Sequence, residues 1–242
     1  MGDVQNATDL TALSNVMHEI ASSRTRIRDL GNQINRLTAD GKCPDIPRLR
    51  ALGPQLVEEL DSLDVLFEFL RIELNPGGIE YAPRNPVNVQ SIFFRALKHY
   101  SDRIRRKELS GNALDRSSGF AVEAYPSLAI VPMVLIDNAT KYAPKGSSIT
   151  VNLDPKARTA SVESMGPRVE TDESCLIFDR GFRGRNAKQL PIAGQGIGLY
   201  IAKKICDAHR FGIRLEQYRG YTVAQTPYST LEFTIDFGPE SA

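Results

Sequence analysis

Apolar residues recur along the first 75 positions with the spacing of two packed helices. The first ladder alternates intervals of three and four, the a/d pattern of a coiled coil, and runs through Leu13, Val16, Ile20, Ser23, Ile27, Leu30, Ile34 and Leu37. After a polar loop, "TADGKCPDIP", a nearly heptad ladder follows at Leu49, Leu52, Leu56, Leu60, Leu63, Phe67, Leu70 and Leu74. We expect Pro54 to mark the start of the second helix or a kink in it. The pattern predicts a hairpin that dimerises into a four-helix bundle.

The remaining chain has a mixed pattern of helices and strands. A Pro- and Gly-rich stretch at 75–86 is typical of a linker. Helical patterns follow at 89–109, 126–144 and 197–209, and strand patterns at 147–154, 159–164, 213–218 and 229–237. These elements predict an α+β sandwich with helices on one face of a mixed sheet. We therefore expect a helical hairpin over 1–75, a linker over 76–87 and a second domain over 88–239.

The composition is that of a globular protein with 41% apolar and 24% charged residues. The net charge of +1 does not favour binding to nucleic acid or to an anionic membrane. No apolar run approaches the length of a membrane span, and the N-terminus does not have the pattern of a signal peptide. Three scattered cysteines predict reduced thiols in a cytoplasmic protein, and three distant histidines predict no histidine-based metal cluster.

Three stretches of the second part carry candidate chemistry. In "GQGIGLYIAKKI", Gly194, Gly196 and Gly198 precede a helix, an arrangement that can present backbone N–H groups to phosphate. It is not a Walker A loop, because no Gly-Lys-Ser/Thr follows, and it is not the dinucleotide fingerprint, because Leu199 stands where the third glycine should be. Asn138 lies on an otherwise apolar helix, where it needs a partner or is a satisfied core amide. "CLIFDRGFRGR" indicates either an aromatic anchor under a basic loop or part of the same site.

Taken together and in this order, these stretches resemble the catalytic core of a sensor histidine kinase of the GHKL-type ATPase superfamily. "LIDNATKYAP" is similar to the N box, "IFDRGFRG" to the F box and "GQGIGLYIAKKI" to the G2 box, while "VESMGPRV" occupies the place of the G1 box. The resemblance extends from residue 13 to about residue 238. It implies a Bergerat-type α/β sandwich that binds ATP and Mg²⁺.

The resemblance also implies roles for individual residues. Asn138 would ligate Mg²⁺, Lys141 and Arg183 would neutralise phosphate charge, and Tyr142 would line the nucleotide pocket. The nucleotide site would further include residues of the G1, F and G2 boxes, namely Ser164, Gly166, Phe178, Gly194, Gly196 and Gly198. The three glycines of the G2 box would allow close backbone approach to ATP and movement of the lid.

Two positions depart from the family pattern. Ser164 stands where the family usually has the aspartate that contacts the adenine amino group, which weakens that contact by about 1 kcal/mol. The adjacent Glu163 is expected on the opposite face of the strand. Val134 stands four residues before Asn138, where the family often has a polar residue.

The first helix contains "MHEIASSRTRI", which resembles a degenerate H box. His18 and Glu19 match, Ser22 stands for the threonine, and Ser23 for the proline. His18 falls at heptad position f, which points to solvent and suits either a phosphoacceptor or an ordinary surface histidine. Glu19 would orient the imidazole of His18 or accept its proton.

The sequence therefore predicts a dimeric, ATP-dependent protein-histidine kinase of a two-component system, whose phosphoryl group passes to an aspartate in the receiver domain of a response regulator. A second hypothesis is a histidine phosphotransfer or scaffold protein with a degenerate ATP site, favoured by Val134, Ser164 and the imperfect H box. A third is a GHKL-type ATPase or binding module in which His18 has no role.

Overall fold

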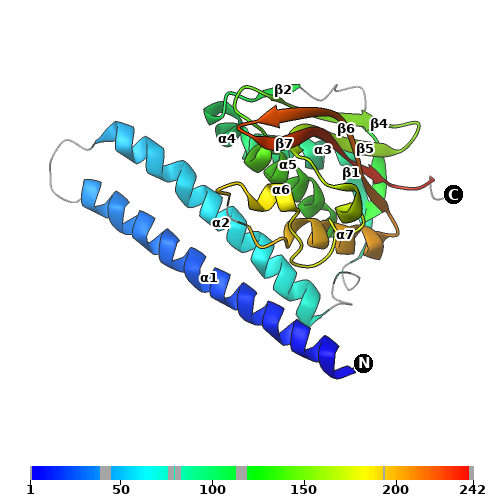
Figure 1. Cartoon of the computed structure of the whole chain (residues 1–242), viewed down its shortest axis with the longest axis horizontal. Coiled ribbons are helices and arrows are strands. Elements are labelled where there is room, and N and C mark those ends of the chain that lie inside the picture. The colour runs from blue at the N-terminus through cyan, green and yellow to red at the C-terminus, as the bar shows by residue number, and fades with distance from the viewer. Residues whose placement is uncertain are drawn as a thin grey trace. The chain divides into compact units, whose positions relative to one another are not determined.

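The computed structural model describes residues 2–38, 45–75, 79, 83–112, 119–192 and 194–239, without the side chains of residues 2–15, 19, 58, 61, 62, 65, 68, 69, 73 and 112. The chain divides into two compact units, Met1–Pro76 and Gly77–Ala242 (Figure 1). Most of the polar loop expected after residue 37 and, within the expected linker, residues 76–78 and 80–82 lie outside the described residues.

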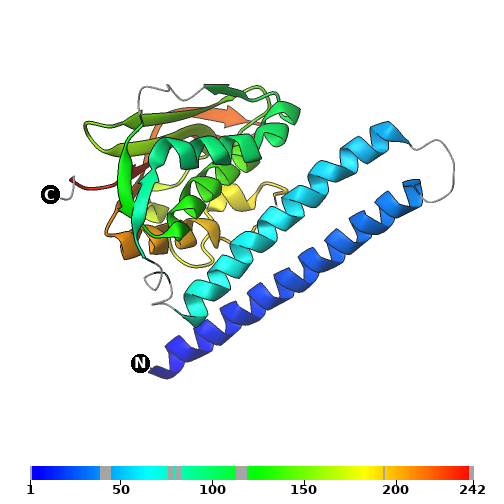
Figure 2. The ribbon, with the colours of Figure 1, turned by 180° about the vertical axis from the view of Figure 1, so that it is seen from behind.

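The first unit is a pair of helices, α1 (Gly2–Thr38) and α2 (Ile46–Leu74), that run side by side in opposite directions (Figures 1 and 2). Helix α2 begins at Ile46 because the Asp45 carboxylate accepts the Arg48 N–H at 3.1 Å. Pro54 therefore lies inside the helix, and the alternative that it marks the helix start is wrong. The polar member of the first ladder, Ser23, is buried and accepts a hydrogen bond from Arg26 at 2.7 Å.

The second unit contains a five-stranded sheet in the order β2-β4-β5-β7-β6, in which β2 is parallel to β4 and all other neighbours are antiparallel. Its strands are β2 (Ser110–Asn112), β4 (Ser148–Asp154), β5 (Thr159–Pro167), β6 (Gly212–Val223) and β7 (Thr226–Asp236). The expected strand pair around "PKAR" is confirmed as β4 and β5. A second sheet, which the sequence did not predict, pairs β1 (Asn85–Asn88) with β3 (Ala121–Ala124).

Helices of this unit lie on one side of the five-stranded sheet (Figures 1 and 2). They are α3 (Val89–His99), α4 (Ser101–Arg106), α5 (Ile130–Tyr142), α6 (Arg185–Lys188) and α7 (Gly198–His209), with short 3₁₀ helices η2 (Pro126–Ala129) and η3 (Thr171–Glu173). The single helix expected over 89–109 is divided at Tyr100, where α3 ends and α4 begins. A mixed sheet with helices on one face confirms the α+β prediction for this unit.

The core lies between α5, α7 and the inner face of the sheet. Alternate residues of β5 and β7, such as Ala160, Val162 and Ile235, point to the helices and are buried, as the two-residue period of a strand requires. From the helices, Ile136 and Ile201 are equally buried. The residues between them in β5 and β7 point to the other face, which is polar.

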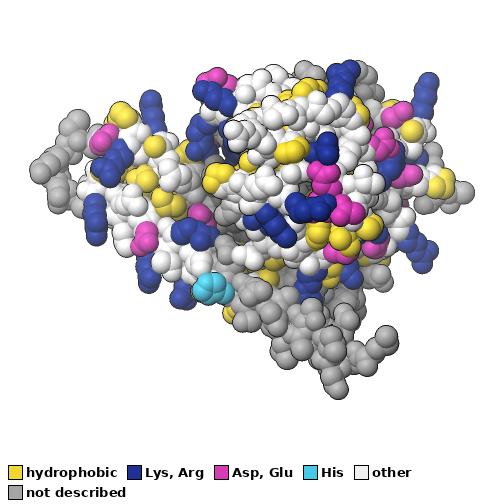
Figure 3. Space-filling view, viewed as in Figure 1, with side chains coloured by type: hydrophobic (Ala, Val, Ile, Leu, Met, Phe, Trp, Pro, Cys, Tyr) yellow, Lys and Arg dark blue, Asp and Glu magenta, His cyan; other side chains and the backbone are white. Residues whose placement is uncertain are grey.

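Four further findings concern the described part of the chain. None of its helices has the length and apolar character that crossing a bilayer would require. Cys175 and Cys206 are free thiols, and Cys43 lies outside the described residues. No group of three or more His, Cys, Asp and Glu side chains among the described residues could hold a metal ion. Acidic and basic side chains are interspersed over the surface in Figure 3.

His209 at the end of α7 is buried and neutral. Its Nε2 accepts the backbone N–H of Tyr125 at 2.9 Å, so the proton is on Nδ1, which donates to the Ile205 carbonyl at 2.7 Å. Burial lowers the pKa of His209 below its usual value. A protonated ring could not accept the Tyr125 N–H, so the folded state disfavours the charged form.

We predict that the free energy of unfolding decreases as the pH falls from about 7 to about 5, because the unfolded chain protonates His209 near its usual pKa of about 6.5 while the folded chain resists protonation. His209→Gln should be less stable at pH 7 and should show a smaller dependence on pH in this range. Urea unfolding at several pH values measures both effects. The control is His99→Gln, because His99 is exposed; an equal loss of pH dependence in both variants would contradict the assignment.

Candidate active site

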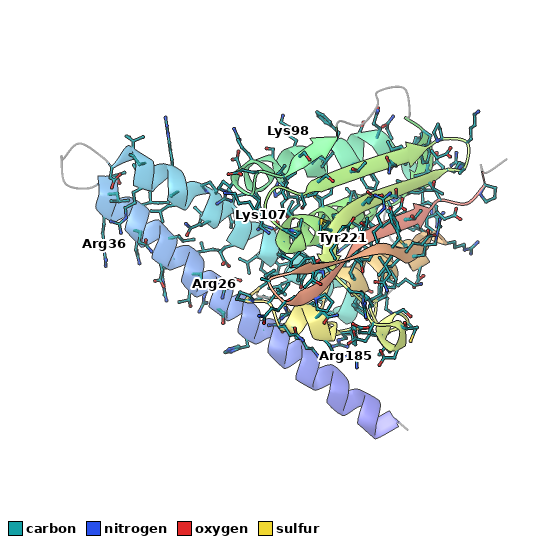
Figure 4. The ribbon with its side chains drawn as sticks, turned by 45° about the horizontal axis from the view of Figure 1, so that its top comes forward. Arg26, Arg36, Lys98, Lys107, Arg185 and Tyr221 are labelled. Atoms are coloured by element: carbon teal, nitrogen blue, oxygen red, sulfur yellow. The ribbon has the colours of Figure 1, made fainter. Side chains whose placement is uncertain are left out.

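Helix α5 carries the candidate residues Asn138, Lys141 and Tyr142, each half-buried. The helix is apolar over most of its surface and ends at Tyr142, before Ala143 and Pro144. Its C-terminal carbonyl groups are satisfied by Lys107, whose Nζ donates to the carbonyl oxygens of Lys141 (2.7 Å) and Ala143 (3.2 Å; Figure 4). The Asn138 amide makes no hydrogen bond with any described residue, so it is available to a ligand.

An ion-pair network that sequence reasoning missed surrounds Asp137. The Asp137 carboxylate accepts from Arg103 Nη1 at 2.6 Å and forms an ion pair with Lys141 one turn further along α5. Because Arg103 belongs to α4, the network fixes α4 against α5 and sets the direction of the Lys141 side chain. Lys141, expected to neutralise phosphate, is thus already paired with a carboxylate. The i,i+4 spacing of Asp137 and Lys141 was visible in the sequence, whereas Arg103 lies 34 residues away.

The segment between β5 and α7 contains the F-box residues. The Phe178 ring lies 6.4 Å from that of Phe233 in an edge-to-face arrangement, which attaches the segment to β7. Arg183, the other candidate phosphate ligand, donates from Nη2 to the carbonyl oxygens of Ala187 (3.1 Å) and Ile192 (2.9 Å). Its Nε is buried without a hydrogen-bond partner among the described residues. Arg183 therefore holds the loop around α6 together, a role that the sequence did not predict.

A second polar network fixes the base of this segment. The buried Glu173 carboxylate accepts the backbone N–H of Arg185 at 2.9 Å, at the start of α6 (Figure 4). Asn186 Nδ2 donates to the Arg168 carbonyl (2.7 Å) and to Glu170 (3.0 Å). Hydrogen bonds from Arg168 and Asn186 lower the pKa of the Glu170 carboxyl below its usual value. These contacts connect the end of β5 to α6.

The three glycines of the G2 box differ in what they permit. Gly196 has φ +70°, and a Cβ on it would lie 2.3 Å from the Phe182 carbonyl oxygen. The carbonyl of Gly196 accepts the Gly181 N–H at 3.1 Å, so the backbone segments around Gly181 and Gly196 lie in contact. Gly198 begins α7, and a Cβ on it would lie 3.2 Å from Val134 Cγ1. Gly194 is exposed, and a Cβ there would meet nothing within 4 Å.

The G1-box residues lie on the inner face of β5. Ser164 is buried opposite Ile149 of β4 and Leu231 of β7, and its hydroxyl makes no hydrogen bond with any described residue. A Cβ on Gly166 would lie 2.6 Å from Leu231 Cδ1, so only glycine fits there without displacing that side chain. The expected opposite orientation of Glu163 is confirmed, because its carboxylate accepts the hydroxyl of Tyr218 on the polar face.

The candidate catalytic residues of the first helix belong to the other compact unit. His18 is exposed on α1, as its position in the heptad predicted, and Ser22 is half-buried. The side chain of Glu19 lies outside the described residues. The structure therefore places the candidate catalytic residues on α1 and the candidate nucleotide-binding residues around α5, β5 and the segment that leads into α7.

We predict that Gly196→Ala destabilises the Gly77–Ala242 unit by about 1–3 kcal/mol, because alanine disfavours a positive φ and its Cβ would clash with the Phe182 carbonyl. Gly194→Ala is the matched control two residues away, where there is open space, and should change stability by less than about 0.5 kcal/mol. Urea unfolding of the full chain compares the two. Equal effects would show that the close approach at Gly196 is not required.

Residues 126–238 match the family described as histidine kinase-, DNA gyrase B- and HSP90-like ATPases. Over 213 residues the chain is 27% identical to the signal transduction histidine-protein kinase/phosphatase MprB of Mycobacterium ulcerans, and over 208 residues it is 26% identical to MprB of Mycobacterium leprae. These alignments cover 84% and 82% of this chain. They cover 40% and 38% of the relatives, so the chain spans well under half of their length.

Solved structures share the fold at low identity. The full-length histidine kinase ShkA in complex with AMPPNP aligns with 95% of this chain and 47% of its own, at a TM-score of 0.56 and 17% identity. The Acinetobacter baumannii histidine kinase AdeS aligns with 92% of this chain and 98% of its own, at a TM-score of 0.52 and 18% identity. Together with the matched ATPase family and the kinase relatives, these findings show that the chain contains the catalytic core of a sensor histidine kinase, with a GHKL-type ATP-binding domain.

Proposed function

We propose that the chain is an ATP-dependent protein-histidine kinase that phosphorylates His18 and passes the phosphoryl group to an aspartate in the receiver domain of a response regulator. The observation that carries the proposal is the exposed imidazole of His18 on a helical unit that precedes a domain of the matched ATPase family. The relatives named as histidine-protein kinases support it.

Two features of the second unit fit a magnesium–nucleotide complex. The amide oxygen of the half-buried Asn138 accepts no hydrogen bond from any described residue, and amide oxygens are suitable ligands for Mg²⁺. The crowded backbone at Gly196 forms a loop that leads directly into the N-terminus of α7, where N–H groups favour anions. When bound, Mg-ATP would supply the γ-phosphoryl group and the metal would offset its charge.

The positively charged candidates would act from positions that already have protein partners. Lys141 would reach phosphate by exchanging its ion pair with Asp137, which Arg103 would continue to balance. Arg183 would contribute through its buried Nε or by shaping the loop that it holds. Ser164 would accept the hydrogen bond of the adenine amino group with a neutral hydroxyl, and Tyr142, Gly166 and Phe178 would line the site.

At His18 the reaction would form a bond between an imidazole nitrogen and the γ-phosphorus and break the bond from that phosphorus to the β–γ bridging oxygen, leaving ADP. The attacking nitrogen must be unprotonated, because its lone pair forms the new bond to phosphorus. Glu19 would accept the proton that the imidazole loses, and Ser22 would lie one turn further along the same helix.

A second candidate is a histidine phosphotransfer or scaffold protein with a degenerate nucleotide site. The neutral Ser164 favours it, since the adenine contact loses its charge. Val134 is weaker support for this candidate. Its side chain is buried and packs toward Gly198 at the start of α7, so packing alone explains an apolar residue at this position. A chain that fails to bind ATP but accepts phosphate on His18 from a partner would support this candidate.

We predict that the full chain, incubated with γ-labelled ATP and Mg²⁺, acquires acid-labile label that His18→Gln removes entirely. His99→Gln is the control, because His99 is also exposed and should leave the label unchanged. Calorimetric titration with a non-hydrolysable ATP analogue separates the two halves of the mechanism. His18→Gln should bind the analogue as the wild type does, whereas Asn138→Ala should lose both label and magnesium-dependent binding. Label that persists in His18→Gln would refute the assignment of His18.

We also propose that the helical unit forms a homodimer. In α2, Leu60, Phe67 and Leu74 recur at intervals of seven and are 45%, 55% and 72% exposed. All three belong to the apolar ladder that the sequence predicted for the second helix, yet the contact with α1 does not bury them. A stripe at one heptad position on a helix is what a second copy of the hairpin would cover in a four-helix bundle.

We predict that the wild-type chain has twice its mass of 26.8 kDa in light scattering and that Phe67→Glu is a monomer with unchanged helix content. A carboxylate at this position would be desolvated in the bundle but exposed in the isolated hairpin. Gln55→Glu adds the same charge to α2 at another exposed position and should remain a dimer. A monomeric wild type at micromolar concentration would overturn the proposal.

A further inference from the structure

The face of the five-stranded sheet that points away from the helices carries a row of three glutamates. Glu163 of β5 lies directly opposite Glu232 of β7, and Glu232 lies directly opposite Glu216 of β6. Their side chains share one face, because they alternate with the buried residues Val162 and Phe233. Like charges directly opposite each other on neighbouring strands destabilise a sheet, so this arrangement needs an explanation.

The outer members of the row have partners within the domain, and the central one does not. Glu163 accepts a hydrogen bond from the Tyr218 hydroxyl, and Glu216 accepts one from Arg214 Nε at 3.0 Å. The half-buried Glu232 carboxylate has no hydrogen bond or ion pair with any described residue. Desolvation, the hydrogen bond to Glu163 and the charges of Glu163 and Glu232 raise the pKa of Tyr218.

A depression of about 230 Å³ lies beside Glu232 on the same face. Its floor is the neighbouring row of the sheet, in which Ser161 and Thr234 are register partners. Both side chains are 6% exposed, line the depression and make no hydrogen bond with any described residue. The hydroxyl groups of two largely buried side chains therefore face the same space as an unpaired carboxylate. The remaining lining residues are Asn152, Leu153, Asp154, Thr159, Arg214 and Glu216.

These groups define the chemistry of a ligand. The carboxylate can only accept, and each hydroxyl can accept as well as donate, so the negative charge of Glu232 favours a donor with positive charge. An inorganic metal ion is disfavoured, because no group of His, Cys, Asp and Glu side chains among the described residues could hold one. A guanidinium group has several donors in one plane and can reach a carboxylate and adjacent hydroxyls together, which an ammonium group does less well.

We propose that this depression is a docking site for an arginine side chain of a partner protein, with Glu232 as the central acceptor and Ser161 and Thr234 beneath it. We choose an arginine because its charge is complementary to that of the site: the cation would offset the negative charge of Glu232 and so reduce the repulsion among the three glutamates. The site lies on the opposite face of the sheet from Ser164 and does not depend on the proposed kinase function.

The test is a titration of the isotopically labelled full chain with the peptide acetyl-Gly-Arg-Gly-Arg-Gly-amide, followed by NMR. Saturable shifts are expected at the amides of Ser161, Glu232 and Thr234. The same peptide with citrulline in place of arginine keeps the shape without the charge and should bind at least about tenfold more weakly. Raising the salt concentration should weaken binding of the arginine peptide.

Glu232→Gln should weaken binding of the arginine peptide about tenfold or more. It should also raise the thermal unfolding midpoint by about 1–3 °C, because it removes the central charge of the row. These opposite effects separate loss of the site from loss of the fold. Glu123→Gln is the control, since Glu123 is an exposed strand glutamate of the small β1–β3 sheet and should change neither quantity.

Several results would overturn the proposal. No saturable shift with the arginine peptide, equal binding of the citrulline peptide, or equal binding by Glu232→Gln would each exclude a guanidinium site at this position. A decrease in the unfolding midpoint of Glu232→Gln would show that the row is not repulsive. Equal shifts produced by MgCl₂ or CaCl₂ alone at the same ionic strength would assign the depression to an inorganic cation instead.

Discussion

The packing of α5 against β5 is the interaction on which the rest of the second unit depends. Leu135 and Ile136 of this helix are almost completely buried, and at about 25 cal/mol per Å² such burial outweighs what any single polar contact of the site contributes. The same helix turns Asn138 out of the core, holds Lys141 through Asp137 and supports the start of α7 through Val134. The site is therefore built on a buried helix, whose position the core fixes.

The segment between β5 and α7 is organised by polar contacts and by backbone geometry rather than by apolar burial alone. Glu173 and Asn186 secure its base, Arg183 ties its middle to backbone carbonyls, and Gly196 allows two stretches of backbone to meet. Each of these part-buried hydrogen bonds contributes about 1 kcal/mol, which is less than the burial of one large apolar side chain in the core.

The two faces of the sheet differ in what they require. The inner face buries apolar residues and presents Ser164 toward the helices, whereas the outer face places Glu232 between two other glutamates. A two-residue shift along β5 leaves a side chain on the same face, while a one-residue shift moves it from core to solvent. Adjacent positions can therefore serve unrelated purposes. Ser164 belongs to the proposed nucleotide site, and Glu163 belongs to the row of glutamates beside the proposed docking site.

The sequence by itself determined the elements and the kind of site, because helical and strand periods and box-like motifs are local patterns. The hairpin, the β4–β5 pair, the helix at Asn138 and the exposure of His18 were all predictable from spacing. Only the tertiary structure decided the β1–β3 sheet, the ion pair between Arg103 and Asp137, and the meeting of Glu163, Glu216 and Glu232. The physical reason is separation along the chain: these contacts join residues that only strand register, loop conformation and core packing bring together.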